Sequence, residues 1–166
     1  MIPAGVDVPD LAQQIAEDSV AYGGDGGEGF ARDVEPGLLD AAAHAESGDF
    51  GSVGFVVLDR TPERTADLRD IAQDVLLATD VDTVVVRAPG SGAIVSDVHS
   101  RSAIESAQYS FLGDPDVVGA AHRFIDDVSG AGINWAVVTV ALLLVIAAVG
   151  ALTAWGVRSV RHRQPA

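Results

Sequence analysis

The chain has 166 residues, of which 48% are hydrophobic, and it carries a formal net charge of −14 with no cysteine. The absence of cysteine excludes a disulfide framework, a thiolate zinc site and a cysteine nucleophile. All 24 Asp and Glu lie between Asp7 and Asp127, against seven Arg before residue 133, which gives this portion a net charge of −17. DNA and RNA are excluded as its partners, because like charges repel.

The amino-terminal region is predicted to stand apart from the folded domain. Residues 6–21 are predicted to form a short helix with Pro9 in its first turn. Five Gly among residues 22–30 predict a flexible linker. Residues 1–30 are therefore expected to precede an acidic α/β domain over residues 31–130.

The first half of this domain shows a helix, a strand and a second helix. A helix is predicted from Pro36 to near Gly48, and the apolar run 52–58 predicts a strand covered on both faces. Thr61 and Pro62 are predicted to begin the next helix as its cap and first residue. Apolar residues then repeat at helical spacing: Leu68, Ile71, Ala72, Val75 and Leu76.

The second half begins with a predicted hairpin. Residues 82–88 and 93–98 predict two strands, joined by a Pro-Gly-Ser-Gly turn. Two helices are predicted to follow, one capped by Ser100 and one by the segment Asp114-Pro115-Asp116. The order helix, strand, helix, strand, strand, helix, helix is typical of an α/β fold.

This order and three segments resemble the TPM domain. The segments are SVGFVVLDRTPERTADLRDIAQDVL, DTVVVRAPGSGAIVSDV and SAIESAQYSFLGDPDVVGAAHRFIDDV, and they cover roughly Pro36 to Val128. The resemblance implies a small sandwich, in which a short mixed β-sheet carries helices on its faces. It also implies acid phosphatase activity. The whole chain is similar to small actinobacterial single-pass membrane proteins of unassigned function.

Polar residues at strand ends are the candidates for a site. Asp59 follows the first predicted strand, and Asp97 and His99 lie at the end of the third. Sites in α/β folds gather at strand ends, and carboxylates and imidazole bind divalent metals. We therefore consider a metal site formed by these three residues. The alternative is that Asp59 caps a turn and Asp97 pairs with Arg101.

No residue is assigned as catalytic. His44 and His122 lie on predicted helices without a partner at ligand spacing, so they are expected to be partly exposed helix residues. No GxSxG elbow is present, so no serine nucleophile is expected. The sequence indicates no cofactor apart from the divalent metal considered above.

An apolar segment over residues 133–157 predicts one transmembrane helix. From Trp135 to Trp155 an α-helix rises about 30 Å, which is the thickness of a bilayer core, and Trp prefers its interfaces. The alternative is a buried core helix. The tail 158–166 is basic, and its arginines are expected at the membrane interface: Arg158, Arg161 and Arg163.

Three functions fit these features. The first is a membrane-anchored protein-interaction module at the bacterial cell envelope, with the lipid bilayer and a membrane-proximal protein as partners. The others are a divalent-metal-dependent phosphatase of TPM type and a subunit of a membrane assembly. Acidic residues before the apolar segment and basic residues after it favour an extracytoplasmic domain and a cytoplasmic tail.

Overall fold

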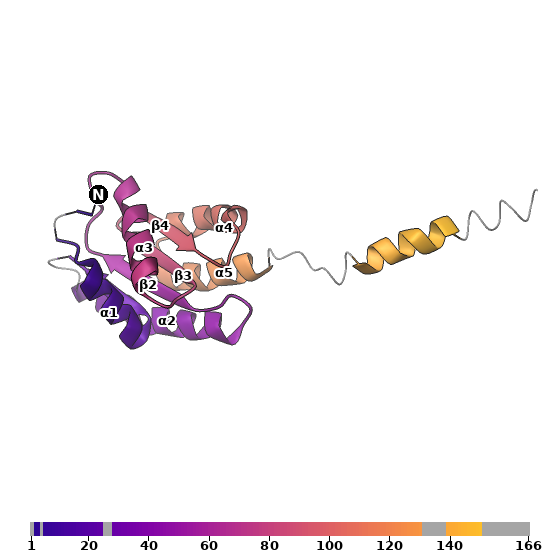
Figure 1. Cartoon of the computed structure of the whole chain (residues 1–166). Helices are drawn as coiled ribbons and strands as arrows, with labels where there is room; N and C mark the ends of the chain where they lie inside the picture. Colours follow the sequence, from indigo (N-terminus) through magenta and orange to yellow (C-terminus); the bar gives the residue numbers. More distant parts are fainter. Residues whose placement is uncertain (1, 4, 25–27, 131–138, 151–166) are drawn as a thin grey trace, which may run out of the picture. The chain divides into compact units, whose positions relative to one another are not determined.

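The computed structural model describes residues 2–3, 5–24, 28–130 and 139–150, with the backbone alone for residues 28–32. Two compact units are present, Met1–Ala131 and Gly132–Ala166. The described part of the first unit contains nine elements, which Figure 1 labels in part. In chain order these are α1 (Val8–Asp18), β1 (Val20–Gly23), α2 (Glu28–Ser47), β2 (Val53–Leu58), α3 (Ala66–Ala78), β3 (Thr83–Ala88), β4 (Ser91–Ser96), α4 (Arg101–Gly113) and α5 (Val117–Gly130).

The strands form one mixed sheet in the order β1-β2-β3-β4. β1, β2 and β3 run parallel, whereas β4 returns antiparallel beside β3 through the predicted hairpin. All six residues of β2 are buried, as the continuous apolar run predicts for a central strand. The α/β class and the short mixed sheet with helices on its faces therefore agree with the structure.

Helices cover both faces of the sheet (Figure 1). One face packs against α2, α4 and α5, and its core includes Phe55, Val85 and Phe124. The other face packs against α1 and α3, and its core includes Val56 and Ile71. Alternate strand residues serve opposite faces, so both layers are apolar.

The predicted linker over residues 22–30 is corrected at both ends, because β1 occupies Val20–Gly23 and pairs with β2, and α2 begins at Glu28. Val20 and Ala21 are buried in the two cores. The side chain of Gln14 accepts from the amide of Tyr22 at 2.9 Å and donates to its carbonyl at 3.2 Å. This side chain of α1 satisfies backbone groups of an edge strand that lacks a second neighbour.

The sequence predicts the start of α4 correctly and the start of α3 incorrectly. Ser100 caps α4 as predicted, accepting from the amide of Ala103 at 3.3 Å. The start predicted at Thr61 and Pro62 is wrong, because α3 begins at Ala66. The Thr61 hydroxyl instead donates to the carbonyl of Pro89 in the turn between β3 and β4.

The predicted transmembrane helix over residues 133–157 is also corrected. In the described part of this segment the helix covers residues 139–150, which correspond to a rise of about 18 Å. A bilayer core is about 30 Å thick, and no helix in the described ranges is long and apolar enough to cross it. The five residues predicted at the interface lie outside the described residues: Trp135, Trp155, Arg158, Arg161 and Arg163.

Candidate binding crevice

The connections that follow β1 and β2 leave the carboxyl ends of these neighbouring strands toward opposite faces of the sheet. After β1 the chain enters α2 on one face, and after β2 it enters α3 on the opposite face. The β1–α2–β2 and β2–α3–β3 connections both lead to the next strand on the same side of the sheet. Because their helices lie on opposite faces, one crossover is right-handed and the other has the rare left-handed form. Divergent connections leave an opening beyond the carboxyl ends of the strands, where α/β proteins bind ligands.

A cavity of about 650 Å³ occupies this opening. Its walls come from the ends of β1 and β2, the loop that leads into α3 and the amino-terminal segment before α1. The lining residues are Ile2, Pro3, Gly5, Val6, Gly23, Gly24, Leu58, Asp59, Arg60, Thr61, Pro62, Glu63, Arg64 and Asp67. We refer to it as the β1/β2 crevice.

Asp59 and Gly24 form the base of the crevice. The amide of Asp59 donates to the carbonyl of Gly23 at 3.2 Å, which extends the pairing of β1 with β2 by one residue. Gly24 has φ +114°, and a Cβ at this position would overlap the carboxylate of Asp59. Only glycine fits there without strain or displacement of Asp59. The Asp59 side chain is 15% exposed and pairs with Nε of Arg60 at 3.4 Å.

The first turn of α3 contributes a second ion pair. Arg64 donates through its terminal nitrogen to Asp67 Oδ1 at 2.9 Å. Burial by itself raises the pKa of Asp67, but hydrogen bonds and the positive charge of Arg64 outweigh it and hold the pKa below its ordinary value. Asp67 is therefore a buried carboxylate at a helix amino terminus, where the helix dipole also favours negative charge.

The chemistry of the crevice suits binding. Its described lining contains no histidine, and its one hydroxyl, on Thr61, already donates to Pro89. Two of its carboxylates are paired with arginine, so no nucleophile with an adjacent base is formed by the described residues. What remains is a recess with apolar walls and a charged rim, which can hold a ligand in place.

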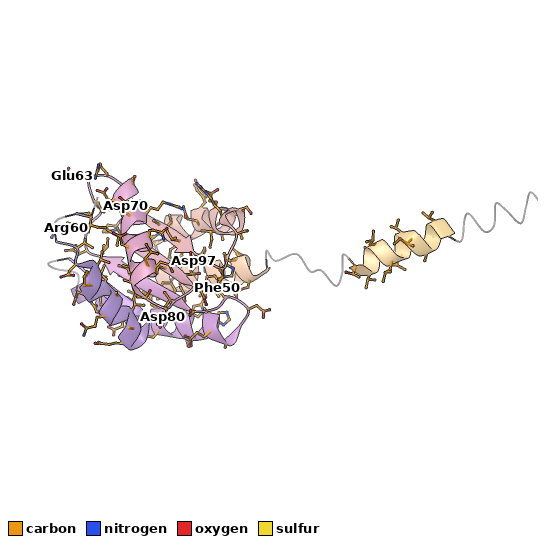
Figure 2. All side chains as sticks on the ribbon, in the orientation of Figure 1. Phe50, Arg60, Glu63, Asp70, Asp80 and Asp97 are labelled. Atoms are coloured by element: carbon orange, nitrogen blue, oxygen red, sulfur yellow. The ribbon has the colours of Figure 1, made fainter. Side chains whose placement is uncertain are left out.

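The three residues predicted to bind a metal do not meet. Ser96 at the end of β4 pairs with Thr83, which pairs with Val53 at the start of β2. Asp59 therefore lies about 20 Å along the strand direction from Asp97 and His99. These two residues lie near the opposite ends of the parallel strands from Asp59. Figure 2 shows Arg60 and Glu63 near one end of this unit and Asp97 farther from that end.

At that opposite end of the strands, Asp97 and His99 form contacts with neighbouring residues of the fold. The amide of Asp97 donates to the carbonyl of Asp82 at 3.0 Å, and His99 Nε2 donates to the carbonyl of Phe50 at 2.7 Å. The His99 ring also lies 4.5 Å from that of Phe50. The described ranges contain no group of three His, Cys, Asp or Glu that could hold a metal ion.

His44 and His122 are partly exposed helix residues, as predicted, with side chains 45% and 30% exposed. Each also has an acidic partner that the sequence did not predict, because His44 contacts Asp126 at 2.8 Å and His122 contacts Asp40 at 3.4 Å. These contacts join α2 to α5, and the two imidazole rings lie 5.4 Å apart. Arg101 pairs with Glu105 at 2.6 Å, one helical turn along α4, and not with Asp97.

Sequence reasoning located one member of the crevice and missed the rest. The sequence singles out Asp59 because it follows a buried strand, and Asp59 does lie in the crevice. The sequence does not predict Gly23 and Gly24 as members of the crevice, because glycine-rich segments are typical of linkers. The signal for them was the apolar pair Val20-Ala21 directly before the glycines, which is too short to define a strand by periodicity.

Comparison with known proteins supports a membrane protein family and does not support the TPM resemblance. No curated protein and no solved structure matches the chain. A family model does match it over its full length, residues 1–166. The chain therefore belongs to the family described as membrane protein Rv1476.

Proposed function

We propose that the chain is a membrane-attached protein-interaction module that binds its partner through the β1/β2 crevice. The observation that carries this proposal is the divergence of the connections after β1 and β2, with a cavity of about 650 Å³ at that point. Crevices of this origin are where α/β domains bind ligands. The similarity to small actinobacterial membrane proteins supports a location at a bacterial cell envelope.

The crevice is held in shape before any ligand binds. A hydrogen bond from Thr61 connects the β2–α3 loop to the β3–β4 turn, and the ion pair of Arg64 with Asp67 stabilises the start of α3. A preformed recess loses little conformational entropy on binding, which supports recognition of a partner. The paired charges and the single committed hydroxyl favour binding over catalysis.

Attachment to a membrane is supported by the apolar helix over residues 139–150. Its large apolar side chains are exposed around the helix, from 57% for Val140 to 66% for Leu144. A helix that is apolar on every side requires an apolar environment, and lipid supplies one. Holding the acidic domain at a membrane raises its effective concentration near a membrane-proximal partner.

Photo-crosslinking in cells tests this function. A photoreactive amino acid placed at Arg60 or Glu63, on the rim of the crevice, is expected to trap one protein partner. The same amino acid at Glu46, an exposed residue in the last turn of α2, is the matched control and is expected to trap little of it. Equal trapping at the rim and at Glu46, or no trapped protein at the rim, would contradict the proposal.

A second function, a subunit of a membrane assembly, is favoured by the same apolar helix. In that case the order of the side chains on the helix matters, because packing between helices in lipid depends on which residues meet. Shuffling residues 139–150 without changing their composition is expected to abolish assembly with other subunits. If the shuffled chain assembles normally, the helix serves only as a contact with lipid.

A further inference from the structure

The β1/β2 crevice adjoins a second hollow. This hollow has a volume of about 620 Å³ and is lined by Ile2, Gly5, Val6, Asp7, Val8, Pro9 and Asp74. The two hollows share Ile2, Gly5 and Val6, so the amino-terminal segment forms a wall common to both. We name the two hollows together the α1/α3 groove, because the starts of α1 and α3 border it.

The walls of the groove are partly apolar. Ile2, Val6 and Val8 are half-buried against the core that α1 and α3 share, and Leu58 is a buried member of that core. Their outer sides remain available to a ligand. Apolar side chains of an occupant would cover them, which is favourable at about 25 cal/mol for each Å² removed from water.

The charges of the groove are predominantly negative. Its lining contains five carboxylates and two arginines, and Arg60 and Arg64 each pair with one carboxylate of the lining, on Asp59 and Asp67. A further carboxylate, that of Asp7, accepts from the amide of Asp10 and caps α1. The two remaining carboxylates are exposed on the rim, on Glu63 and Asp74.

We propose that the α1/α3 groove binds an extended segment of a partner protein in which basic residues are interleaved with apolar ones. This inference rests on the proposed function and names the chemistry of the partner. Basic side chains of the segment pair with Glu63 and Asp74, and its apolar side chains cover Ile2, Val6 and Val8. A second copy of this chain is disfavoured as the occupant, because its own α/β unit carries the same excess of acidic residues.

Charge complementarity favours this occupant over other macromolecules. The portion of the chain before residue 133 carries 24 acidic residues against seven arginines, so it attracts basic segments and repels anionic lipid headgroups and nucleic acid. Long-range attraction alone would act over the whole surface. The groove adds a place where charge and apolar surface are combined, which makes the binding local.

The test uses the full chain in detergent and two fluorescein-labelled peptides, one alternating Arg with Val and one alternating Arg with Ser. The groove variant carries Glu63→Arg and Asp74→Arg. The control variant carries Glu46→Arg and Asp80→Arg, which make the same change in net charge at exposed positions outside the groove lining. Figure 2 shows Asp80 well away from Glu63.

Fluorescence anisotropy is expected to give an affinity about tenfold lower for the groove variant with the Arg/Val peptide, because two attractive contacts become repulsive. The control variant is expected to change it less than about threefold. The Arg/Ser peptide is expected to bind the unaltered chain more weakly than the Arg/Val peptide. Equal losses in the two variants, or equal affinity for the two peptides, would overturn the inference.

Failure of this inference and failure of the proposed function give different results. If the rim positions trap a protein and the trapped segment is acidic or uncharged, the named partner chemistry is wrong while the interaction module stands. If the rim positions trap nothing in cells while the Arg/Val peptide still binds the groove, the interaction module is wrong. Mass spectrometry of the crosslinked peptide separates these cases.

Discussion

The carboxylate of Asp59, at the carboxyl end of β2, lies directly against the Cα atom of Gly24, at the carboxyl end of β1. The backbone of Gly24 has φ +114°, so the close approach and the conformation both require glycine. This contact closes the base of the β1/β2 crevice and joins two strands whose connections leave in opposite directions. Integrity of the crevice should therefore depend on Gly24.

The variant Gly24→Ala is expected to lower the free energy of unfolding by about 2–4 kcal/mol, because it combines backbone strain with displacement of Asp59. Gly90→Ala is the matched control, since Gly90 also has a positive φ, +71°, but has open space around its Cα. The control is expected to cost about 1 kcal/mol. Urea unfolding followed by circular dichroism measures both. Losses of the same size would show that the contact with Asp59 contributes nothing.

The edge of β1 gives a second prediction. Gln14→Ala removes the side chain that bonds both backbone groups of Tyr22. We expect a loss of about 1–3 kcal/mol in the free energy of unfolding, because these groups are part-buried. Gln13→Ala, which removes only an exposed bond to Glu17, is expected to change stability by less than about 0.5 kcal/mol. Faster amide exchange at Tyr22 in the Gln14 variant alone would support the account. Equal exchange in both variants would contradict it.

Arg87 gives a third prediction, because its guanidinium donates hydrogen bonds to backbone carbonyls at the carboxyl end of α4. It donates to the carbonyls of Leu112 at 2.6 Å and Asp114 at 2.9 Å, and it lies over the Phe111 ring at 5.4 Å. Arg87→Ala is expected to cost about 2–4 kcal/mol. Arg87→Lys is expected to recover only part of this loss, since an ammonium cannot reproduce the planar fork. Thermal unfolding of both variants checks this. Full recovery by lysine would mean that charge alone matters.

The pH dependence of stability should include a contribution from Asp82. Hydrogen bonds from the amide and hydroxyl of Ser52 lower the pKa of Asp82, against the effect of burial, and the charge of His99 lowers it further. An unfolded Asp has a pKa of about 3.9. The unfolded state therefore binds the proton more readily, so this contribution is present above pH 4 and is lost as the pH falls through the folded pKa.

The variant Asp82→Asn is expected to reduce stability at pH 6 and to flatten the decline between pH 4 and pH 2. Unfolding by urea at a series of pH values gives the slope. Asp80→Asn is the control, because Asp80 is exposed to solvent, so the slope should stay the same. An unchanged slope for Asp82→Asn would mean that the Ser52 bonds do not favour the ionised form.

The longer strands of the fold were predictable, whereas the short strand β1 was not. The start of the long helix α2 was not predictable either, because this helix begins at Glu28 and contains Pro36, the residue predicted to begin it. The run 52–58 and the hairpin have enough residues for apolar patterns to decide their structure. β2 and β3 lie where those patterns predict, and β4 begins and ends two residues before its predicted place. β1 has four residues, two of them buried and the last a glycine, so no pattern develops. Its place in the sheet is decided by pairing with β2 and by Gln14, which are contacts between distant residues.

The metal site failed for a topological reason. Asp59 and Asp97 each follow a strand, but β2 and β4 run in opposite directions, because the hairpin reverses the chain after β3. Their carboxyl ends therefore lie at opposite edges of the sheet. The hairpin and the helical crossover were both predictable, and together they already separate the two carboxylates. The crevice, in contrast, depends on which face each connecting helix covers, which apolar periodicity alone does not decide.

Amide hydrogen exchange of the full chain, with and without the protein trapped from the crevice rim, tests the central claim most directly. Partner binding is expected to slow exchange in residues 58–64 and at the start of α3, where the crevice wall lies. Exchange in residues 97–105, at the far edge of the sheet, is expected to stay the same. Protection confined to the far edge, with none at residues 58–64, would contradict the assignment of the β1/β2 crevice as the binding site.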